Sequence, residues 1–443
     1  MLENLNMEPD GVKAIQTTLA DLDACFLHGF IGGQHEILAA LPSLFDGTPL
    51  YPRLQTSIQA LAQNTFIEAH FVTLAAARSA LQGTLYDLLR HHILSVLGRS
   101  ATHATDNLSI APTQTAPLLD STREWLMELA IAGFARLERE AVTSFYPTLT
   151  QLRGNLATIS HAALLTGFFH ELINALPVKS TNDVPLMRWV DLWSRAMLGA
   201  VGLANPPTPV PASGILYPLG VELRQHARFA SLVVYGVLKQ GDFAQWVRQT
   251  WSSFKATAIQ GNEIWLLFPK AQPLLEHLLQ GKAMSLRDMP MLPDGDLLWD
   301  ANAAESGKKF KPLDIALAYC GIGQSLIVSP ASPLERHPVQ LTEPIALTDY
   351  AIQEGQLHLK EGLVLALDAR RAGLAAEELA GTTALLGLLH YDSGEWSIQP
   401  LLTNNPVGRF EFAGRAGVEL LKKPPKTSTV SILQERASRL LRK

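Results

Sequence analysis

Histidines are the side chains of this chain that most readily bind metal ions or move protons at neutral pH, and 13 are present. His170-Glu171 begins like the motif that zinc hydrolases carry on a helix. That motif needs a second histidine four residues after the first, where Asn174 stands. His91 and His92 are adjacent, so on a helix they point about 100° apart. We therefore assign no residue as a metal ligand.

Sequence motifs for a catalytic nucleophile or for a phosphate-binding loop are also missing. The chain has no Gly-x-Ser-x-Gly motif and no Walker lysine after a glycine-rich loop. Cys320 precedes Gly321-Ile322-Gly323, but no third glycine follows at the spacing of dinucleotide-binding loops. Cys320 is either a buried thiol or, with a histidine beside it, a nucleophile. We assign no catalytic residue and no cofactor, although catalytic groups can also converge from distant segments.

Three carboxylates near Trp299 form the remaining acidic cluster: Asp294, Asp296 and Asp300. Paired carboxylates serve glycoside hydrolysis, and Asp-Gly-Asp resembles part of a calcium loop. The terminal glutamate of the calcium loop is missing here, so we expect a solvated loop.

Charge is distributed unevenly along the chain. The net charge is −5, yet residues 420–443 carry seven basic residues and one acidic residue, Glu435. The basic residues are the candidate interaction residues of this chain: Lys422, Lys423, Lys426, Arg436, Arg439, Arg442 and Lys443. Three interpretations stay open for them: a solvated terminal helix whose leucines dock on the body, a segment that docks on an acidic partner, and a nucleic-acid contact.

Composition indicates a compartment. Hydrophobic residues make up 47% of the chain and charged residues 17%, against about 25% charged in an ordinary globular chain. The apolar runs look too short to span a membrane, and the acidic start lacks the features of a leader peptide, so we expect no membrane insertion. Two cysteines in a chain of this length fit a reducing compartment, and we expect a cytoplasmic protein with partner-covered surfaces.

Residues 1–203 are predicted to be helical. Apolar residues recur at helical spacing over 12–29, 52–63, 66–97 and the neighbourhood of 163–173. Ser121 and Glu124 have the spacing of a capping box, and Asp183 is a suitable N-cap for a helix whose face carries Trp189 and Trp193. Residues 204–213 hold four prolines and are predicted to be an extended linker.

After the linker the pattern changes to short strands with turns. We expect an α+β domain over 214–305 and a β-rich domain with a basic C-terminal helix over 306–443. Predicted strands include 229–238, 251–259, 264–268, 314–320, 325–328, 356–360, 363–368, 385–391 and 396–401. Helices are expected at 271–280, 374–381 and 429–442, and a polar connection at 281–309. The predicted fold class is α+β multidomain: an all-helical N-terminal half followed by mostly antiparallel β-containing middle and C-terminal domains.

Several short segments of the second half carry a family resemblance: PLGVELR (218–224), FASLVVYG (229–236), GNEIW (261–265), DIALAY (314–319), GEW (394–396) and PL (400–401). They resemble parts of uncharacterised bacterial proteins that accompany MoxR-type AAA ATPases, von Willebrand-type proteins and SWIM zinc-finger proteins. SWIM fingers use Cys and His ligands, and this chain lacks such a Cys-x-Cys set, so no zinc role carries over. The resemblance implies a subunit or accessory role beside an ATPase.

Our leading hypothesis is a non-catalytic accessory or scaffold subunit of a bacterial cytoplasmic assembly, with protein partners that include an AAA ATPase. One alternative is an enzyme, a hydrolase, whose site is assembled from scattered residues. The other is nucleic-acid binding through the basic tail, which the acidic body disfavours. The sequence leaves the oligomeric state open.

Overall fold

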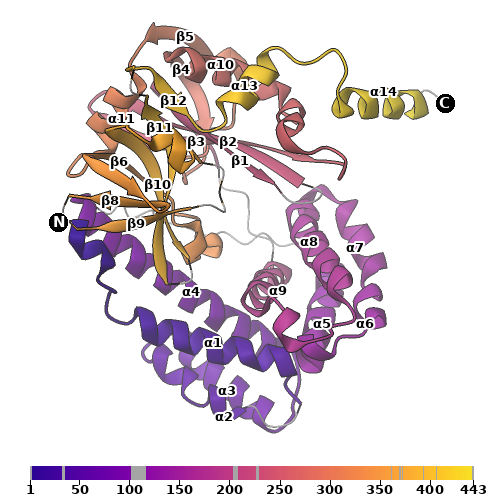
Figure 1. Cartoon of the computed structure of the whole chain (residues 1–443). Helices are drawn as coiled ribbons and strands as arrows, with labels where there is room; N and C mark the ends of the chain where they lie inside the picture. The colour runs from indigo at the N-terminus through magenta and orange to yellow at the C-terminus, as the bar shows by residue number, and fades with distance from the viewer. Residues whose placement is uncertain are drawn as a thin grey trace.

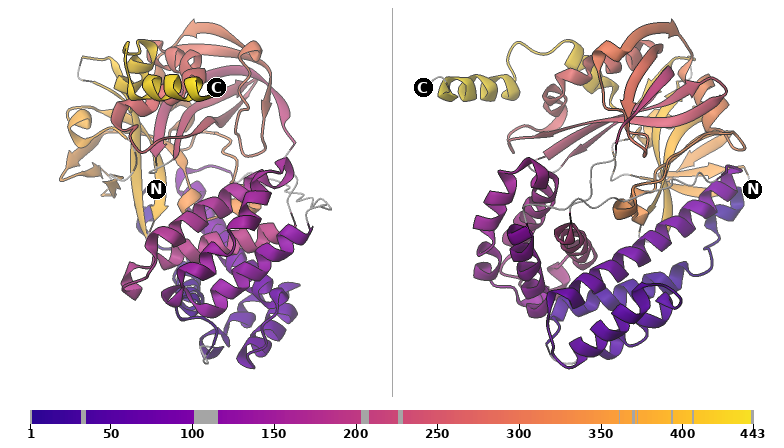
Figure 2. Two further views of the ribbon diagram at one scale, coloured as in Figure 1. Left: turned by 90° about the vertical axis from the view of Figure 1, so that its right-hand side faces the viewer. Right: turned by 180° about the vertical axis from the view of Figure 1, so that it is seen from behind.

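The computed structural model describes residues 2–31, 35–100, 116–202, 208–225, 229–360, 362–368, 371, 373–392, 394–405 and 407–441. Helices fill the described chain up to residue 202, and two β-sheets with a few helices make up the rest (Figure 1). The turned views show the helices on one side of the molecule and the sheets on the other (Figure 2). The predicted α+β class, helical first and mostly antiparallel β afterwards, is confirmed.

The helical half packs around an aromatic core. Its α-helices are α1 (Val12–His28), α2 (His35–Leu38), α3 (Leu50–Ala62), α4 (Glu68–Leu97), α5 (Ala116–Ala132), α6 (Arg139–Thr143), α7 (Tyr146–Arg153), α8 (Ile159–Ala175) and α9 (Leu186–Val201). Trp189 and Trp193 are fully buried on one face of α9, and the Trp193 ring lies 4.5 Å from that of Phe26 on α1. The Trp193 indole N–H donates to the carbonyl of Leu126 at 2.7 Å, which satisfies its only polar atom.

Two predicted helix starts are wrong. The helix α5 already runs through Ser121, whose hydroxyl donates back to the carbonyl of Pro117, so Ser121 and Glu124 do not form a capping box. Asp183 lies in a 3-10 turn, η5 (Thr181–Asp183), and α9 begins only after Pro185. In both cases a local capping signal was outweighed by the position at which the apolar face begins.

The first sheet has the order β3-β2-β1-β4-β5 and is antiparallel throughout. Its strands are β1 (Val210–Gln225), β2 (Phe229–Gln240), β3 (Phe243–Phe254), β4 (Lys282–Met291) and β5 (Ala304–Lys309). Part of the predicted linker therefore belongs to the sheet, since Val210 to Ala212 pair with β4; residues 203–207 lie outside the described part. The predicted polar connection at 281–309 is wrong, because it contains β4 and β5.

The second sheet has the order β6-β10-β11-β9-β8-β7, and β12 pairs with β11. Its strands are β6 (Glu343–Thr348), β7 (Tyr350–Gln353), β8 (Gln356–Leu359), β9 (Val364–Leu367), β10 (Ala384–Asp392), β11 (Glu395–Asn404) and β12 (Phe410–Phe412). Of its pairings, only β9 with β11 is parallel. The predicted strands at 356–360, 363–368, 385–391 and 396–401 are confirmed, with ends that differ by at most three residues.

Three other predicted strands are wrong. Residues 314–320 belong to the helix α11 (Pro312–Cys320), and 264–268 overlap the 3-10 helix η6 (Gly261–Leu267). Residues 325–328 form no strand and contribute one bridge, from Ile327 to Gln245. Three of the remaining helices lie close to their predicted places: α10 (Gln272–Gln280), α12 (Ala376–Leu379) and α14 (Thr429–Leu441). The helix α13 (Arg415–Lys422) was not predicted.

The helix α4 connects the two halves. Its first part, including Phe71 and Leu81, is buried in the helical core, and its last turns, including Ile93 and Leu97, are buried with the second sheet. A separate core lies between the first sheet and its covering helices and also takes in residues of β10 and β11.

Residues Leu156–Ala175, which end in α8, are long and apolar enough to span a membrane by length and composition alone. The same helix buries Leu165, Phe168 and Leu172 in the helical core, which accounts for its composition.

Candidate functional site

The described part of the predicted basic tail forms an arm that leaves the body. We call residues 422–441 the C-terminal arm; it begins at the end of α13 and contains α14, which projects from the first sheet's side of the molecule (Figures 1 and 2). Its attachment is the first turn of α14, where Val430 is buried and the Thr429 N–H donates to Glu263 at 3.1 Å. Ser428 and Ser431 cap the helix by exchanging hydrogen bonds between side chains and backbone.

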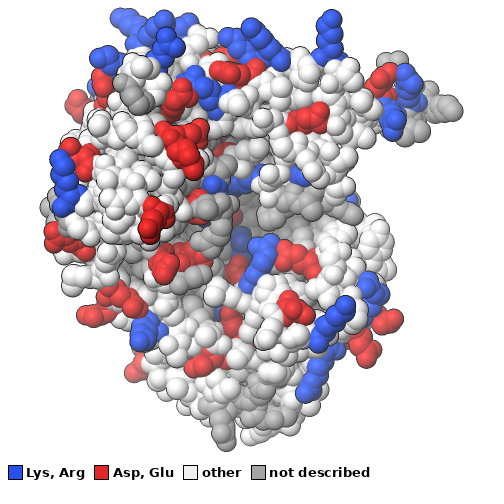
Figure 3. Space-filling model, in the orientation of Figure 1, with Lys and Arg blue, Asp and Glu red and all other residues white. Residues whose placement is uncertain are grey.

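On both sides of that turn, the arm presents exposed basic side chains. Those of Lys422, Lys423, Lys426, Arg436 and Arg439 are all exposed, whereas Arg442 and Lys443 lie outside the described residues. Figure 3 shows basic groups on α14 and along the upper edge of the same face. Arg439 forms an exposed ion pair with Glu435 one turn earlier, at 2.5 Å.

The arm also has apolar groups without cover. Leu433 is half-buried against the body, but Ile432 is 40% exposed and Ala437 is exposed. Of the residues expected to dock this helix on the body, Leu433 does so and Ala437 does not. The side chains of Leu440 and Leu441 lie outside the described part.

Two buried ionic clusters join distant segments. In the first, Arg78 of α4 donates to both oxygens of Asp23 on α1, at 2.7 and 3.0 Å, and to Asp191 of α9 at 3.2 Å. Burial raises the pKa of Asp23, and Arg78 offsets this only in part. Burial would lower the pKa of Arg78, but the two aspartates raise it overall, so the guanidinium stays charged.

In the second cluster, Arg90 and Arg99 approach Glu343 of β6 at 3.7 and 3.9 Å. The guanidinium of Arg99 also donates to the carbonyls of Pro344 and Cys320, at 2.9 and 2.8 Å. Burial raises the pKa of Glu343 above its ordinary value, and the charges of the two arginines offset this rise only in part. These contacts fasten the end of α4 to the second sheet and to α11.

A cavity of about 480 Å³ lies where α1 and α4 face the end of β10. We call it the α1–β10 cavity. Its lining combines apolar and polar side chains from both halves: Gln16, Leu19, Ala20, Asp23, Gln82, Leu85, Leu186, Met187, His337, Pro338, Val339, Tyr391, Asp392 and Gly394. Pro338 and Val339 belong to the 3-10 turn η10 (Pro338–Gln340).

A narrow crevice beside this cavity is lined by Ser79, Asp191 and His337 among others. These residue types can form a nucleophile, a base and an orienting acid. The ring of His337 accepts the Val339 N–H on Nδ1 at 3.1 Å, and its Nε2 lies 4.0 Å from Asp191. Neither ring nitrogen of His337 therefore faces Ser79. In this arrangement the histidine cannot take a proton from the serine hydroxyl. Burial lowers the pKa of His337, and the ring is neutral at pH 7.

Another polar group joins the two sheets. The hydroxyl of Tyr235 donates to Glu222 at 2.8 Å, and Arg224 donates to the same carboxylate oxygen at 2.9 Å. Arg371 approaches Glu222 at 3.8 Å and Asp368 at 3.3 Å. Burial would raise the pKa of Glu222, but these partners lower it overall, so the carboxylate is stabilised in its charged form.

No protein-family model, no curated protein and no solved structure matches this chain.

The cysteines are placed as unreactive thiols. Cys25 and Cys320 are buried, and burial is the main cause that raises the pKa of each to about 12. A thiol with such a pKa contains almost no thiolate at neutral pH. The Gly-x-Gly after Cys320 has a structural use, because the Gly323 N–H donates to the Leu97 carbonyl at the end of α4.

The acidic cluster near Trp299 is also used internally. Asp294 and Asp296 both bind the guanidinium of Arg248 on β3, and Asp300 caps a 3-10 turn by accepting the Asn302 N–H. Within the described residues, no group of three or more His, Cys, Asp or Glu side chains could hold a metal ion. The expectation of a solvated loop was therefore incomplete, because Asp294 and Asp296 are paired with Arg248.

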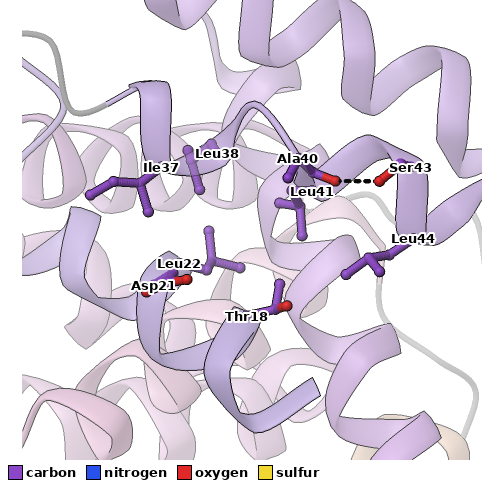
Figure 4. A pocket seen from close by; sticks show the side chains of 9 residues that line it. All are labelled: Thr18, Asp21, Leu22, Ile37, Leu38, Ala40, Leu41, Ser43 and Leu44. Carbon is purple, nitrogen blue, oxygen red and sulfur yellow. Dashed lines mark hydrogen bonds between the residues drawn. The ribbon is translucent and has the colours of Figure 1, made fainter. Parts of the chain in front are cut away.

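A smaller hollow of about 140 Å³ lies beside α1. In Figure 4, Ile37, Leu38 and Leu41 face Leu22 across it, and Ser43 donates to the Ala40 carbonyl at 2.7 Å. Its wall is chiefly aliphatic, so it can take one apolar side chain but brings no set of polar groups together.

The sequence did not single out Arg78, Gln82 or Asp191. One signal was available for Asp23, a carboxylate on the same helical face as the apolar Leu19 and Phe26. A charge at such a position predicts a buried partner on another element but does not say which.

Proposed function

We propose that this protein is an accessory or scaffold subunit of a bacterial cytoplasmic assembly, and that its C-terminal arm docks on an acidic partner protein. The observation that carries the proposal is the arm: a capped helix whose described contacts with the body come from its first residues up to Leu433, with basic and apolar side chains exposed together after them. Helices that bind in a partner's groove combine an apolar face with flanking charge of the opposite sign to the partner.

The choice of a protein partner follows from the apolar residues. Phosphates of nucleic acid would engage Arg436 and Arg439 but give no cover to Ile432. An acidic groove with an aliphatic floor would engage all three. The net charge of the chain is −5, which also disfavours a polyanion.

The resemblance to proteins that accompany MoxR-type AAA ATPases makes such an ATPase the first partner to test. Both cysteines are buried thiols, which supports a reducing compartment.

The test measures the mass of native complexes after capture of the full chain co-expressed with the ATPase. The double variant Arg436→Glu/Arg439→Glu should lose the complex, because it reverses two exposed charges of the arm. Lys308→Glu/Lys309→Glu is the matched control, since it reverses two exposed charges on β5, and it should keep the complex. A monomeric wild-type chain, or equal complexes with both variants, would remove the proposal. Retention of nucleic acid that is lost only in the arm variant would favour the nucleic-acid alternative.

One observation favours a second candidate, a hydrolase. Ser79, Asp191 and His337 come from three elements and line one crevice. The ring of His337 would have to turn so that one nitrogen faces Ser79. Labelling by a fluorophosphonate probe that is lost in Ser79→Ala and kept in Ser43→Ala would support this function. No labelling of the wild-type chain would eliminate the serine mechanism.

A further inference from the structure

The α1–β10 cavity is large enough for a small organic molecule, since ligand pockets commonly measure about 300–1,000 Å³. It lies between the helical half and the second sheet, a location that is common for such sites. Most of its inner wall is aliphatic, with Leu19 and Leu85 almost fully buried. At its rim, Met187 is 60% exposed and Val339 is 39% exposed, so apolar surface continues outward from the cavity.

Gln82 is the feature that points to a ligand. It lines the cavity from α4 and is only 5% exposed. Among the residues that the structure describes, none makes a hydrogen bond to its side-chain amide. The amide atoms of Gln82 are not among the described buried polar atoms that lack a partner, so they have access to solvent. An amide that meets only solvent is free to donate to, and to accept from, a bound molecule.

One further donor lies in the same lining. The hydroxyl of Tyr391 accepts a hydrogen bond from the amide of Gln16 at 3.2 Å, which leaves its own O–H as a donor. His337 contributes its ring to the wall, because its Nδ1 accepts the Val339 N–H and its Nε2 is turned towards Asp191 of the neighbouring crevice. With the amide N–H groups of Gln82, the lining offers several donors to an acceptor atom.

The charges nearby favour a neutral molecule. Both oxygens of Asp23 are bound by Arg78, so this carboxylate is not available to a cation. The donors on Tyr391 and Gln82 are also unsuited to a cationic group. An anion would meet the carboxylates of Asp23 and Asp392 at the wall.

We propose that the α1–β10 cavity binds a neutral, mostly apolar small molecule with a carbonyl-type acceptor, held by Gln82 and Tyr391. The site uses residues of both halves, and it is independent of the C-terminal arm. A bound molecule would therefore also add contacts between α1 and the end of β10.

The experiment titrates the full chain with Nile red, a neutral apolar dye that carries a carbonyl and fluoresces in apolar surroundings. The wild-type chain should bind one dye saturably with a blue-shifted emission. Gln82→Leu keeps the side chain's size but removes the amide, and it should weaken binding roughly threefold to tenfold, the worth of one hydrogen bond. Ala20→Phe should weaken it at least about tenfold, because Ala20 is an exposed lining residue and the added ring occupies the cavity.

Ala14→Phe is the matched control, with the same change at an exposed position on another face of α1. It should bind the dye like the wild-type chain, and circular dichroism should show that all variants are folded. The anionic dye ANS should bind at least about tenfold more weakly than Nile red to the wild-type chain. Unsaturable binding, equal affinities of the wild-type chain and Ala20→Phe, equal loss in Ala14→Phe, or tighter binding of ANS would overturn the proposal. The arm variant Arg436→Glu/Arg439→Glu should bind Nile red normally, so this result and the partner test can fail separately.

Discussion

Replacing Arg78 by methionine tests the reasoning about buried charge most directly. The guanidinium is 1% exposed and donates to Asp23, Asp191 and the carbonyl of Met187, so it joins α1, α4 and α9 at one point. Arg78→Met removes all of these bonds and leaves Asp23 buried without its partner. Breaking a buried pair in this way costs about 3–5 kcal/mol. We expect a loss in the upper half of that range, because Asp191 and Met187 lose a donor as well.

The assay is urea unfolding of the full chain, followed by circular dichroism and by tryptophan fluorescence, with a free energy taken only where the two transitions coincide. Arg188→Met is the matched control, because Arg188 is 54% exposed in its pair with Glu171. An exposed pair contributes about 0–1 kcal/mol. The double variant Arg78→Met/Asp23→Leu should recover much of the loss, because it replaces a buried pair by apolar groups.

The pH dependence has a definite sign. Burial raises the pKa of Asp23, and without Arg78 the rise is larger. A carboxyl whose folded pKa lies above its unfolded pKa stabilises the fold at low pH, and this contribution is lost as the pH rises through the folded pKa. The penalty of Arg78→Met should therefore be smaller at acid pH than at neutral pH. A loss below about 1 kcal/mol at neutral pH, or a double variant that loses as much as both single changes added together, would refute the reasoning.

Three more outcomes are expected. His161→Leu should flatten the fall in stability between about pH 6.5 and pH 4, measured by urea unfolding, because burial lowers the pKa of His161 to about 4 and a depressed pKa gives stability that is lost as pH falls. Tyr235→Phe should lower the free energy of unfolding by about 1.5–3 kcal/mol, since its hydroxyl donates to the buried Glu222 carboxylate. Cys25 and Cys320 should resist iodoacetamide at neutral pH in the native chain and react in urea, as followed by mass spectrometry.

Each of these has a contrary result. An unchanged pH profile in His161→Leu would mean that the buried ring does not govern that slope. A loss below about 0.5 kcal/mol in Tyr235→Phe would show that water or Arg224 replaces the hydroxyl. Rapid alkylation of either native thiol would show that the buried position opens readily to solvent.

The sequence predicted the elements whose pattern is long and regular. The helices α1, α4, α8 and α9 carry apolar faces over three or more turns, so their period is unambiguous. The run at 314–320 is only seven residues and is apolar after Asp314, which suits a strand or a buried helix equally well. Pro312 at the first turn and Asp314 after it were the signals for a helix start.

The strands β4 and β5 were missed for a different reason. The strand β4, inside the sheet, carries Asp288 at a positive φ of 53°, and the edge strand β5 carries Lys308 and Lys309. Charge on an edge strand prevents further pairing, and it also hides the alternation that identifies a strand.

The exposed basic residues of the arm could be predicted from sequence because they lie close together in one segment of the chain. The cavity could not, because Gln82, His337 and Tyr391 are brought together by the packing of α4 against the second half. Pairing of Arg78 with Asp23 spans 55 positions, and no spacing rule relates them.

The helix α4 limits how the molecule can move. At 1.5 Å per residue its 30 residues form a rod about 45 Å long, with one end in the helical core and the other in the core of the second sheet. A helix of this kind resists stretching, so the two halves cannot be drawn apart along it. We therefore expect the two halves to move relative to each other by rotation about α4. The buried Arg90 and Arg99, at the end of α4 near the second sheet, would lie at the centre of that rotation.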